Sequence, residues 1–153
     1  MLTYEKRGRN LILTVEGVPE PFTIPPLPTN PGLQITATYL GIAGGEGSAA
    51  DLAEALMIAV DGATQDDDGR YRARPDGERP NYTRAGEELT QEEAENLMSA
   101  AFFWQTALGL AGVQTFIEHG EGTLGSLHAL STLTARMRAL QHRDNTNAPT
   151  VGA

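Results

Sequence analysis

The sequence predicts a small, mainly α-helical domain with a short N-terminal β-hairpin. Apolar residues recur at intervals of three and four through much of the chain, which is the spacing of one face of a helix. Side chains that cap helices precede two of these segments, whereas branched apolar residues gather near the N-terminus. A chain of 153 residues suits one domain, and we expect a single helical domain over residues 1–143.

Two short extended segments predict the hairpin. Residues 10–17 are rich in branched apolar side chains, and residues 21–25 form a second run after a turn that contains Gly17. Pro25 and Pro26 lack the backbone N–H that an inner strand donates to its neighbour. We therefore expect this element to lie at an edge or to lead straight into the segment that follows.

Two helices are expected after the hairpin. The first runs from Thr29 to about Ala43, because Pro31 suits the first turn of a helix and a run of glycines then ends it. Ser48 favours the start of a second helix, with the Asp51 carboxylate near its positive end. The apolar stripe of this second helix consists of Leu52, Ala55, Leu56, Ala59 and Val60.

Residues 61–89 are polar, charged and rich in turn residues, and this composition predicts a long loop. A brief hairpin is expected around Pro75-Asp76-Gly77. The arginines at positions 70, 72 and 74 alternate along the segment, and the consecutive aspartates at 66–68 precede them. We expect an exposed loop whose arginines pair with these aspartates or with another acidic surface.

The second half of the chain predicts two long helices. Thr90 and Glu93 form a capping box, in which each side chain accepts a hydrogen bond from the other residue's backbone N–H. The helix that follows is expected to reach about Glu118, with a bend near its glycines. A last helix over 123–143 carries a stripe of Leu127, Leu130, Leu133, Met137 and Leu140. Residues 144–153 have little to bury and are expected to be a disordered tail.

The charge of the chain bears on the partners it can have. A net charge of -9 opposes non-specific binding to nucleic acid and to anionic membranes, so a protein partner is favoured. The longest apolar stretch, residues 100–113, falls short of the roughly 20 residues that cross a bilayer. The chain has no Cys, which excludes disulfides and thiolate chemistry and fits an intracellular protein.

Several patterns resemble chemical sites but lack the context that such sites need. Gly45-x-Gly47-x-x-Ala50 follows a predicted helix, whereas a dinucleotide-binding fingerprint follows a strand. The aspartates at 66–68 do not match the register of a calcium loop. His128 and Ser131 share one side of a predicted helix without an evident third member of a triad, which leaves a small hydrolase as a remote alternative. We expect a protein that is not an enzyme and that uses no cofactor or metal.

The densest aromatic cluster supplies the first candidate residues for binding a partner. Phe102, Phe103 and Trp104 are consecutive, so they point about 100° apart on a helix and cannot all face one flat core. One reading places a member of the cluster at a groove or partner; the other buries all three between neighbouring helices. The candidate partner-binding residues are Phe103, Trp104, Leu127, Met137 and Leu140.

Three motifs in this order carry a resemblance to a known family: Phe22-Thr23-Ile24-Pro25-Pro26, then Ala101-Phe102-Phe103-Trp104-Gln105-Thr106, then Gly125-Ser126-Leu127-His128-Ala129-Leu130. With the hairpin and the helix-rich middle, the chain resembles tail assembly chaperones encoded by siphophages of actinobacteria. The likeness spans residues 11–140. The stretch from Asp66 to Arg84 matches no pattern of that family.

The resemblance implies binding in place of catalysis. Such chaperones coat the hydrophobic tape measure protein, help to recruit tail tube subunits around it, and leave before the virion is complete. The implied partners are the tape measure protein and the tail tube protein, with a homo-oligomer also possible, and the implied location is the host cytoplasm. The alternative is a virion structural protein of the head–tail connector or the tail.

Overall fold

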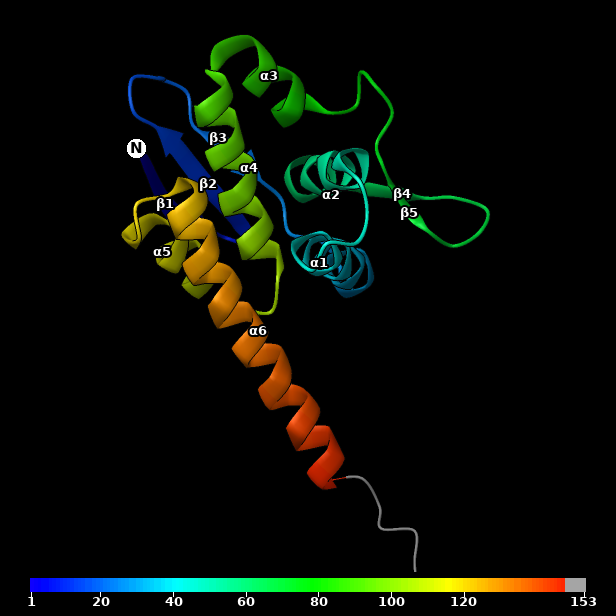
Figure 1. The fold of residues 1–153 in the computed structure, drawn as a ribbon. Coiled ribbons are helices and arrows are strands. Elements are labelled where there is room, and N and C mark those ends of the chain that lie inside the picture. The colour runs from blue at the N-terminus through cyan, green and yellow to red at the C-terminus, as the bar shows by residue number, and fades with distance from the viewer. Residues whose placement is uncertain (148–153) are drawn as a thin grey trace, which may run out of the picture.

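The computed structural model describes residues 1–147 and confirms a mainly α-helical fold with a small N-terminal sheet (Figure 1). Six helices occur in this part of the chain. Three strands form an antiparallel sheet in the order β1-β2-β3: β1 (Leu2–Arg7), β2 (Asn10–Val15) and β3 (Phe22–Ile24).

The predicted hairpin is confirmed as the pair β2 and β3, and β1 is an additional edge strand. The register places Leu13 opposite both Tyr4 and Phe22, so alternate side chains of all three strands point to one face. That face is buried in the core. Strand β1 was not among the predicted elements because half of its side chains are charged, which is common in an exposed edge strand.

Helices α1 (Thr29–Ala43) and α2 (Ala49–Asp61) confirm the two predicted helices. Ser48 and Asp51 form a capping box at the start of α2, since the Ser48 hydroxyl accepts from Asp51 N and the Asp51 carboxylate accepts from Ser48 N. The same arrangement joins Thr90 and Glu93 at the start of α4 (Gln91–Gln105).

The prediction of a loop over residues 61–89 is wrong in part, because this stretch contains two strands and a helix. Strands β4 (Ala63–Gln65) and β5 (Tyr71–Ala73) form a hairpin that turns at residues 66–70, before the expected turn at 75–77. Helix α3 (Pro80–Glu88) follows. The Asp61 carboxylate accepts hydrogen bonds from Asn81 N at 2.9 Å and Tyr82 N at 2.8 Å, and so caps α3 from a distant position that local sequence patterns cannot reveal.

The helix expected from Thr90 to about Glu118 is divided into α4 and α5 (Leu110–Glu118). Helix α4 ends at Thr106, whose hydroxyl donates to Phe103 O and accepts from Leu108 N. Gly109 then adopts a positive φ of 58°, which glycine tolerates without steric cost. The expected bend is therefore a complete break.

Helix α6 (Gly122–Asn147) confirms the last predicted helix and extends it by one turn. Residues 144–147 are helical, so the expectation of a disordered tail is wrong at these positions. Residues 148–153 lie outside the described part of the chain. Figure 1 shows α6 starting beside α5 and running well beyond the rest of the body.

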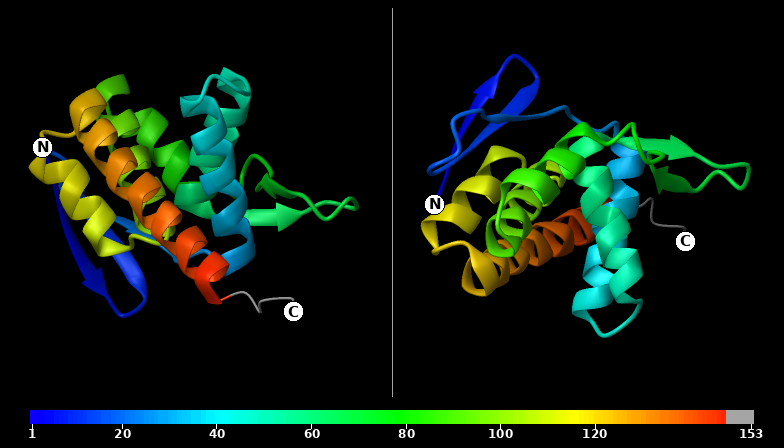
Figure 2. Two further views of the ribbon diagram at one scale, coloured as in Figure 1. Left: turned by 60° about the horizontal axis from the view of Figure 1, so that its bottom comes forward. Right: turned by 90° about the horizontal axis from the view of Figure 1, so that it is seen from above.

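Helix α4 is the centre of the domain (Figure 2). It packs against α2 on one side, α5 on another and strand β2 on a third. The Gln105 amide closes its C-terminal end: Oε1 accepts from Leu27 N, and Nε2 donates to Pro25 O and Ala59 O, each at 2.9 Å. One side chain thereby joins α4 to α2 and to the segment that follows the sheet.

Helices α5 and α6 approach closely because Gly125 lies at their contact. A Cβ atom built at Gly125 would lie 2.3 Å from Phe116 O, which no real side chain tolerates. The close approach of these helices therefore depends on the missing side chain at Gly125.

We expect Gly125→Ala to lower the free energy of unfolding by about 1–3 kcal/mol, because the methyl group forces α5 and α6 apart. Gly86→Ala is the matched control. Gly86 lies in α3 with open space around its Cα, so this change should raise stability by about 0.5–1 kcal/mol. Urea denaturation followed by circular dichroism measures both, and equal effects would contradict the close contact.

Candidate functional site

The aromatic cluster of α4 lies in the core, so Phe103 and Trp104, two of the predicted partner-binding residues, are packed inside the domain. Phe102 and Phe103 have no exposed surface, and Trp104 is 9% exposed. Phe103 contacts the rings of Phe102 and Phe116, with centroids 5.2 and 5.9 Å away. The three residues do point in different directions, but α4 has core on several sides. Only an edge of Trp104 borders a shallow pocket, beside Lys6.

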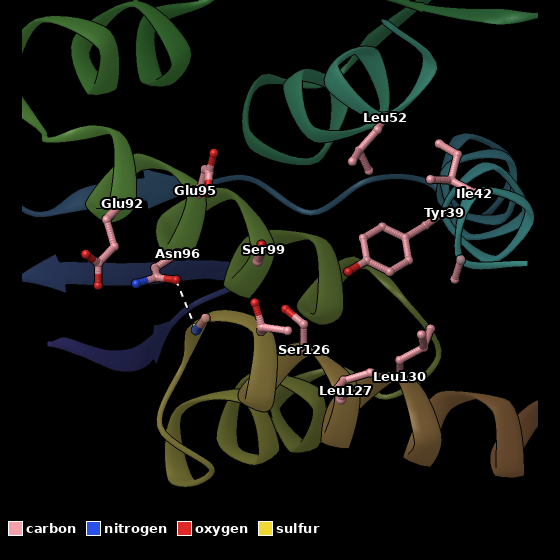
Figure 3. Close-up of a pocket in the computed structure, with 13 residues that line it drawn as sticks. Tyr39, Ile42, Leu52, Glu92, Glu95, Asn96, Ser99, Ser126, Leu127 and Leu130 are labelled. Atoms are coloured by element: carbon pink, nitrogen blue, oxygen red, sulfur yellow. Dashed lines mark hydrogen bonds between the residues drawn. The ribbon is translucent and has the colours of Figure 1, made fainter. Parts of the chain in front are cut away.

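A cleft of about 670 Å³, here called the central cleft, opens on the surface of the described chain (Figure 3). Helices α1 and α2 form one wall, α4 forms the other, and the first turns of α6 form the floor. Its lining residues are Tyr39, Ile42, Ala43, Leu52, Glu92, Glu95, Asn96, Ser99, Gly122, Thr123, Ser126, Leu127 and Leu130.

Tyr39 joins the central cleft to the aromatic core. Its ring stacks on Phe102, with ring centroids 4.2 Å apart and an interplanar angle of 17°. Its hydroxyl points into the cleft toward Ser126 (Figure 3). Burial raises the pKa of the Tyr39 phenol above its ordinary value, and the interaction with the Ser126 hydroxyl partly offsets that rise. The cleft wall at this point is therefore an aromatic ring whose hydroxyl faces the cleft.

Asn96 fixes the floor of the cleft relative to the α4 wall. Its Oδ1 accepts a hydrogen bond from Gly122 N at 3.1 Å, drawn as a dashed line in Figure 3. This bond satisfies one of the free N–H groups at the start of α6. It also keeps the N-terminal turn of α6 beside the N-terminal half of α4.

The α4 rim of the central cleft is acidic. Glu93 is occupied by the capping box, whereas Glu92 and Glu95 are exposed and line the cleft. No Lys or Arg is among the lining residues in the described part of the chain. The cleft thus combines two carboxylates on one rim with apolar side chains on the opposite wall and floor.

A second hollow of about 440 Å³, here called the distal pocket, lies further along α6. It meets the central cleft at Ala43 and Leu130, which line both. Its lining residues are Leu40, Ala43, Gly44, Leu130, Thr134, Met137, Arg138 and Gln141. The two hollows together follow α6 for most of the length over which its side chains are described.

The three predicted partner-binding residues on α6 have different positions. Leu127 lines the central cleft and is 57% exposed, and Met137 is half-buried in the distal pocket. Leu140 is 36% exposed but lines neither hollow. Leu133, from the same predicted stripe, is fully buried. The structure therefore brings Leu127 and Met137 to two adjoining hollows, and Leu140 lies outside both.

Most residues of the cleft walls were not among the predicted site residues. Tyr39 and Ile42 lie on α1, which has no charged residue and hence no pattern that tells its inner face from its outer face. Glu92 and Glu95 lie at a helix start, where acidic residues are common and do not by themselves indicate a binding surface. The available signal was the absence of any Lys or Arg between Arg84 and Arg136, which predicts an acidic surface over α4 and the start of α6.

The Asp-rich turn serves the hairpin in which it lies. Asp66 Oδ1 accepts from Asp68 N and Arg70 N, both at 3.0 Å. Arg72 pairs with Asp66 at 3.2 Å and with Glu54 at 3.3 Å, which confirms the expected pairing for this arginine. The glycines at 45 and 47 lie in the loop between α1 and α2, as expected for an interhelical connection.

His128 and Ser131 lie on the exposed side of α6, outside both hollows. The His128 ring stacks on His119, with centroids 3.8 Å apart. Hydrogen bonds between described residues do not join His128 to Ser131. The side chain of His142, the third imidazole, lies outside the described side chains.

Within residues 1–147, no helix combines the length and the apolar character that a bilayer span requires. Among the side chains that the structure describes, no group of three or more His, Asp or Glu residues is placed to hold a metal ion.

Comparison of the chain with protein-family models, with curated proteins and with solved structures finds no significant match.

Truncation of Phe103 and of Leu127 should have different effects on stability, because Phe103 lies in the core and Leu127 at the surface. We expect Phe103→Ala to lower the free energy of unfolding by about 3–5 kcal/mol, because it leaves a cavity beside Phe116. Leu127→Ala should change it by less than about 0.5 kcal/mol, since the Leu127 side chain is mostly in solvent. Chemical denaturation measures both values, and a large loss for Leu127→Ala would show that it supports the fold.

Proposed function

We propose that this chain is a tail assembly chaperone of a long-tailed phage, and that it binds a helix of the tape measure protein along α6. The observation that carries the proposal is the open apolar surface formed by the central cleft and the distal pocket. Leu127, Leu130 and Met137 line this surface on α6, and Ile42 and Leu52 face them from α1 and α2. Apolar side chains that gather in one exposed groove mark a binding surface far better than scattered exposed ones do.

The spacing of these side chains suits a helical client. Leu127 and Met137 are ten residues apart on α6, so they lie about 15 Å apart along the helix axis. An amphipathic helix in a groove places apolar side chains at every third or fourth position, and three of its turns span about the same distance. A client helix lying beside α6 would therefore contact both hollows with one apolar stripe.

The remaining surface of the chain supports a role in keeping a client soluble. The net charge of -9 makes molecules of this protein repel one another. When this protein covers the apolar helices of a client, the complex carries the same negative charge, and such complexes repel one another. The same complex would present the client to tail tube subunits, as the resemblance to tail assembly chaperones implies.

Co-expression with the tape measure protein tests the proposal. We expect the wild-type chain to raise the soluble fraction of the tape measure protein and to co-purify with it. Leu127→Asp should weaken binding about thirtyfold, because a charge placed in a hot spot loses at least about 2 kcal/mol. Leu33→Asp is the matched control: Leu33 is 56% exposed on α1 but lines neither hollow, so binding should be retained.

Failure of the wild-type chain to bind the tape measure protein or raise its solubility would reject the proposal. Equal loss of binding for the two aspartate variants would reject this surface as the client site. Mass spectrometry of purified particles tests the alternative of a virion structural protein. A chaperone should be absent or scarce in the particle, whereas a structural subunit should be abundant.

A further inference from the structure

The central cleft and the distal pocket differ in charge. This difference indicates which charged residues a client helix carries. On the basis of the proposed function, we infer that the client helix carries a pair of Lys or Arg residues beside its apolar stripe, near one end. We further infer that an acidic residue occupies the other end of the contact. The partner is thus an amphipathic helix with basic residues near one end and an acidic residue near the other, and these charges complement those of the groove.

The acidic end of the groove is formed by Glu92 and Glu95. They are three residues apart on α4, so their side chains lie on the same face of that helix. Both are exposed, and neither has an ion-pair partner among the residues whose side chains the structure describes. A pair of cations at neighbouring helical positions of a client matches this spacing.

The surroundings of Glu92 and Glu95 reinforce their negative potential. The segment between Arg84 and Arg136 supplies α4, α5 and the first half of α6 without a single Lys or Arg. Helix α1, which forms part of the opposite wall, has no charged residue. A cationic side chain of a client therefore meets no competing Lys or Arg among the described residues that line the central cleft, whereas an anionic side chain would be repelled.

Arg138 marks the opposite end of the groove. It lines the distal pocket, whereas Arg136 lines neither hollow. Gly122 and Ser126 lie beside the acidic rim, so Arg138 is about 18–24 Å further along α6. The acidic residue of a client should accordingly lie about 12–16 residues from its basic pair, in either direction along the chain.

Synthetic helical peptides test the basic pair. Three peptides of about 20 residues share one leucine stripe and differ only in two flanking positions, which hold Lys, Gln or Glu. Fluorescence anisotropy with the full chain should rank them Lys, Gln, Glu, with the Lys peptide about tenfold tighter than the Glu peptide. The difference should shrink as the salt concentration rises, because exposed charges are screened.

Charge reversal on this chain should invert that ranking. We expect E92R/E95R to bind the Glu peptide more tightly than the Lys peptide, and E92Q/E95Q to bind all three alike. The control E87R/E118R makes the same change of net charge at exposed positions outside the groove and should keep the original order. Thermal melting checks that each variant folds. If the positive charges of E92R/E95R at the start of α4 lower its stability, the neutral E92Q/E95Q provides the test.

Arg138 is tested with a Lys peptide that carries Glu about 14 residues from its basic pair. Arg138→Glu should weaken binding about two- to fivefold, and Arg136→Glu should leave it unchanged. Equal effects of the two changes would overturn the inference for this end of the groove.

The outcomes distinguish this inference from the proposed function. If the three peptides bind equally, the charge preference is wrong while helix binding stands. If none binds, helix binding itself fails. If the chain alone forms a dimer in sedimentation and Leu127→Asp abolishes that dimer, the groove belongs to a second copy, and the inference is overturned.

Discussion

The burial of three consecutive aromatic residues at the end of α4 is the constraint on which the rest of the structure depends. Side chains at consecutive helical positions point about 100° apart, so Phe102, Phe103 and Trp104 reach the interior only if packing elements surround the helix. Strand β2, α2 and α5 meet this condition. The break after Gln105 contributes to this burial, because it lets α5 turn back and pack against α4.

This arrangement leaves the N-terminal half of α4 with one open side. The elements that cover the aromatic end do not enclose Glu92, Glu95 and Ser99, which face the space between α1, α2 and α6 (Figure 3). Asn96 holds the start of α6 beside this face through its bond to Gly122 N, and Gly125 sets the close packing of α6 on α5. The groove is therefore a consequence of how the core is closed, and its walls are anchored to that core.

The positions of the acidic residues in the groove follow from the burial of α4. A buried helix such as α4 carries its charges only near its ends, and those at its start also suit the positive end of the helix dipole. Glu92, which lies in the first turn, therefore stabilises α4, and Glu92 and Glu95 both line the cleft. Electrostatic features of this kind contribute more to the choice of a partner than to affinity, which would come from the apolar stripe of α6.

The sequence by itself determined the elements whose cause is local. The capping boxes at Ser48 and Thr90 and the stripe of α6 follow from spacing between near neighbours, which is why the starts of α2 and α4 and the course of α6 were predicted. Tertiary structure decided what depends on distant partners: the cap that Asp61 provides for α3, the burial of Phe103 and Trp104, and the meeting of Tyr39 with Ser126 across the cleft. Periodicity shows that a helix has an apolar face, but only the other helices determine which part of that face stays uncovered.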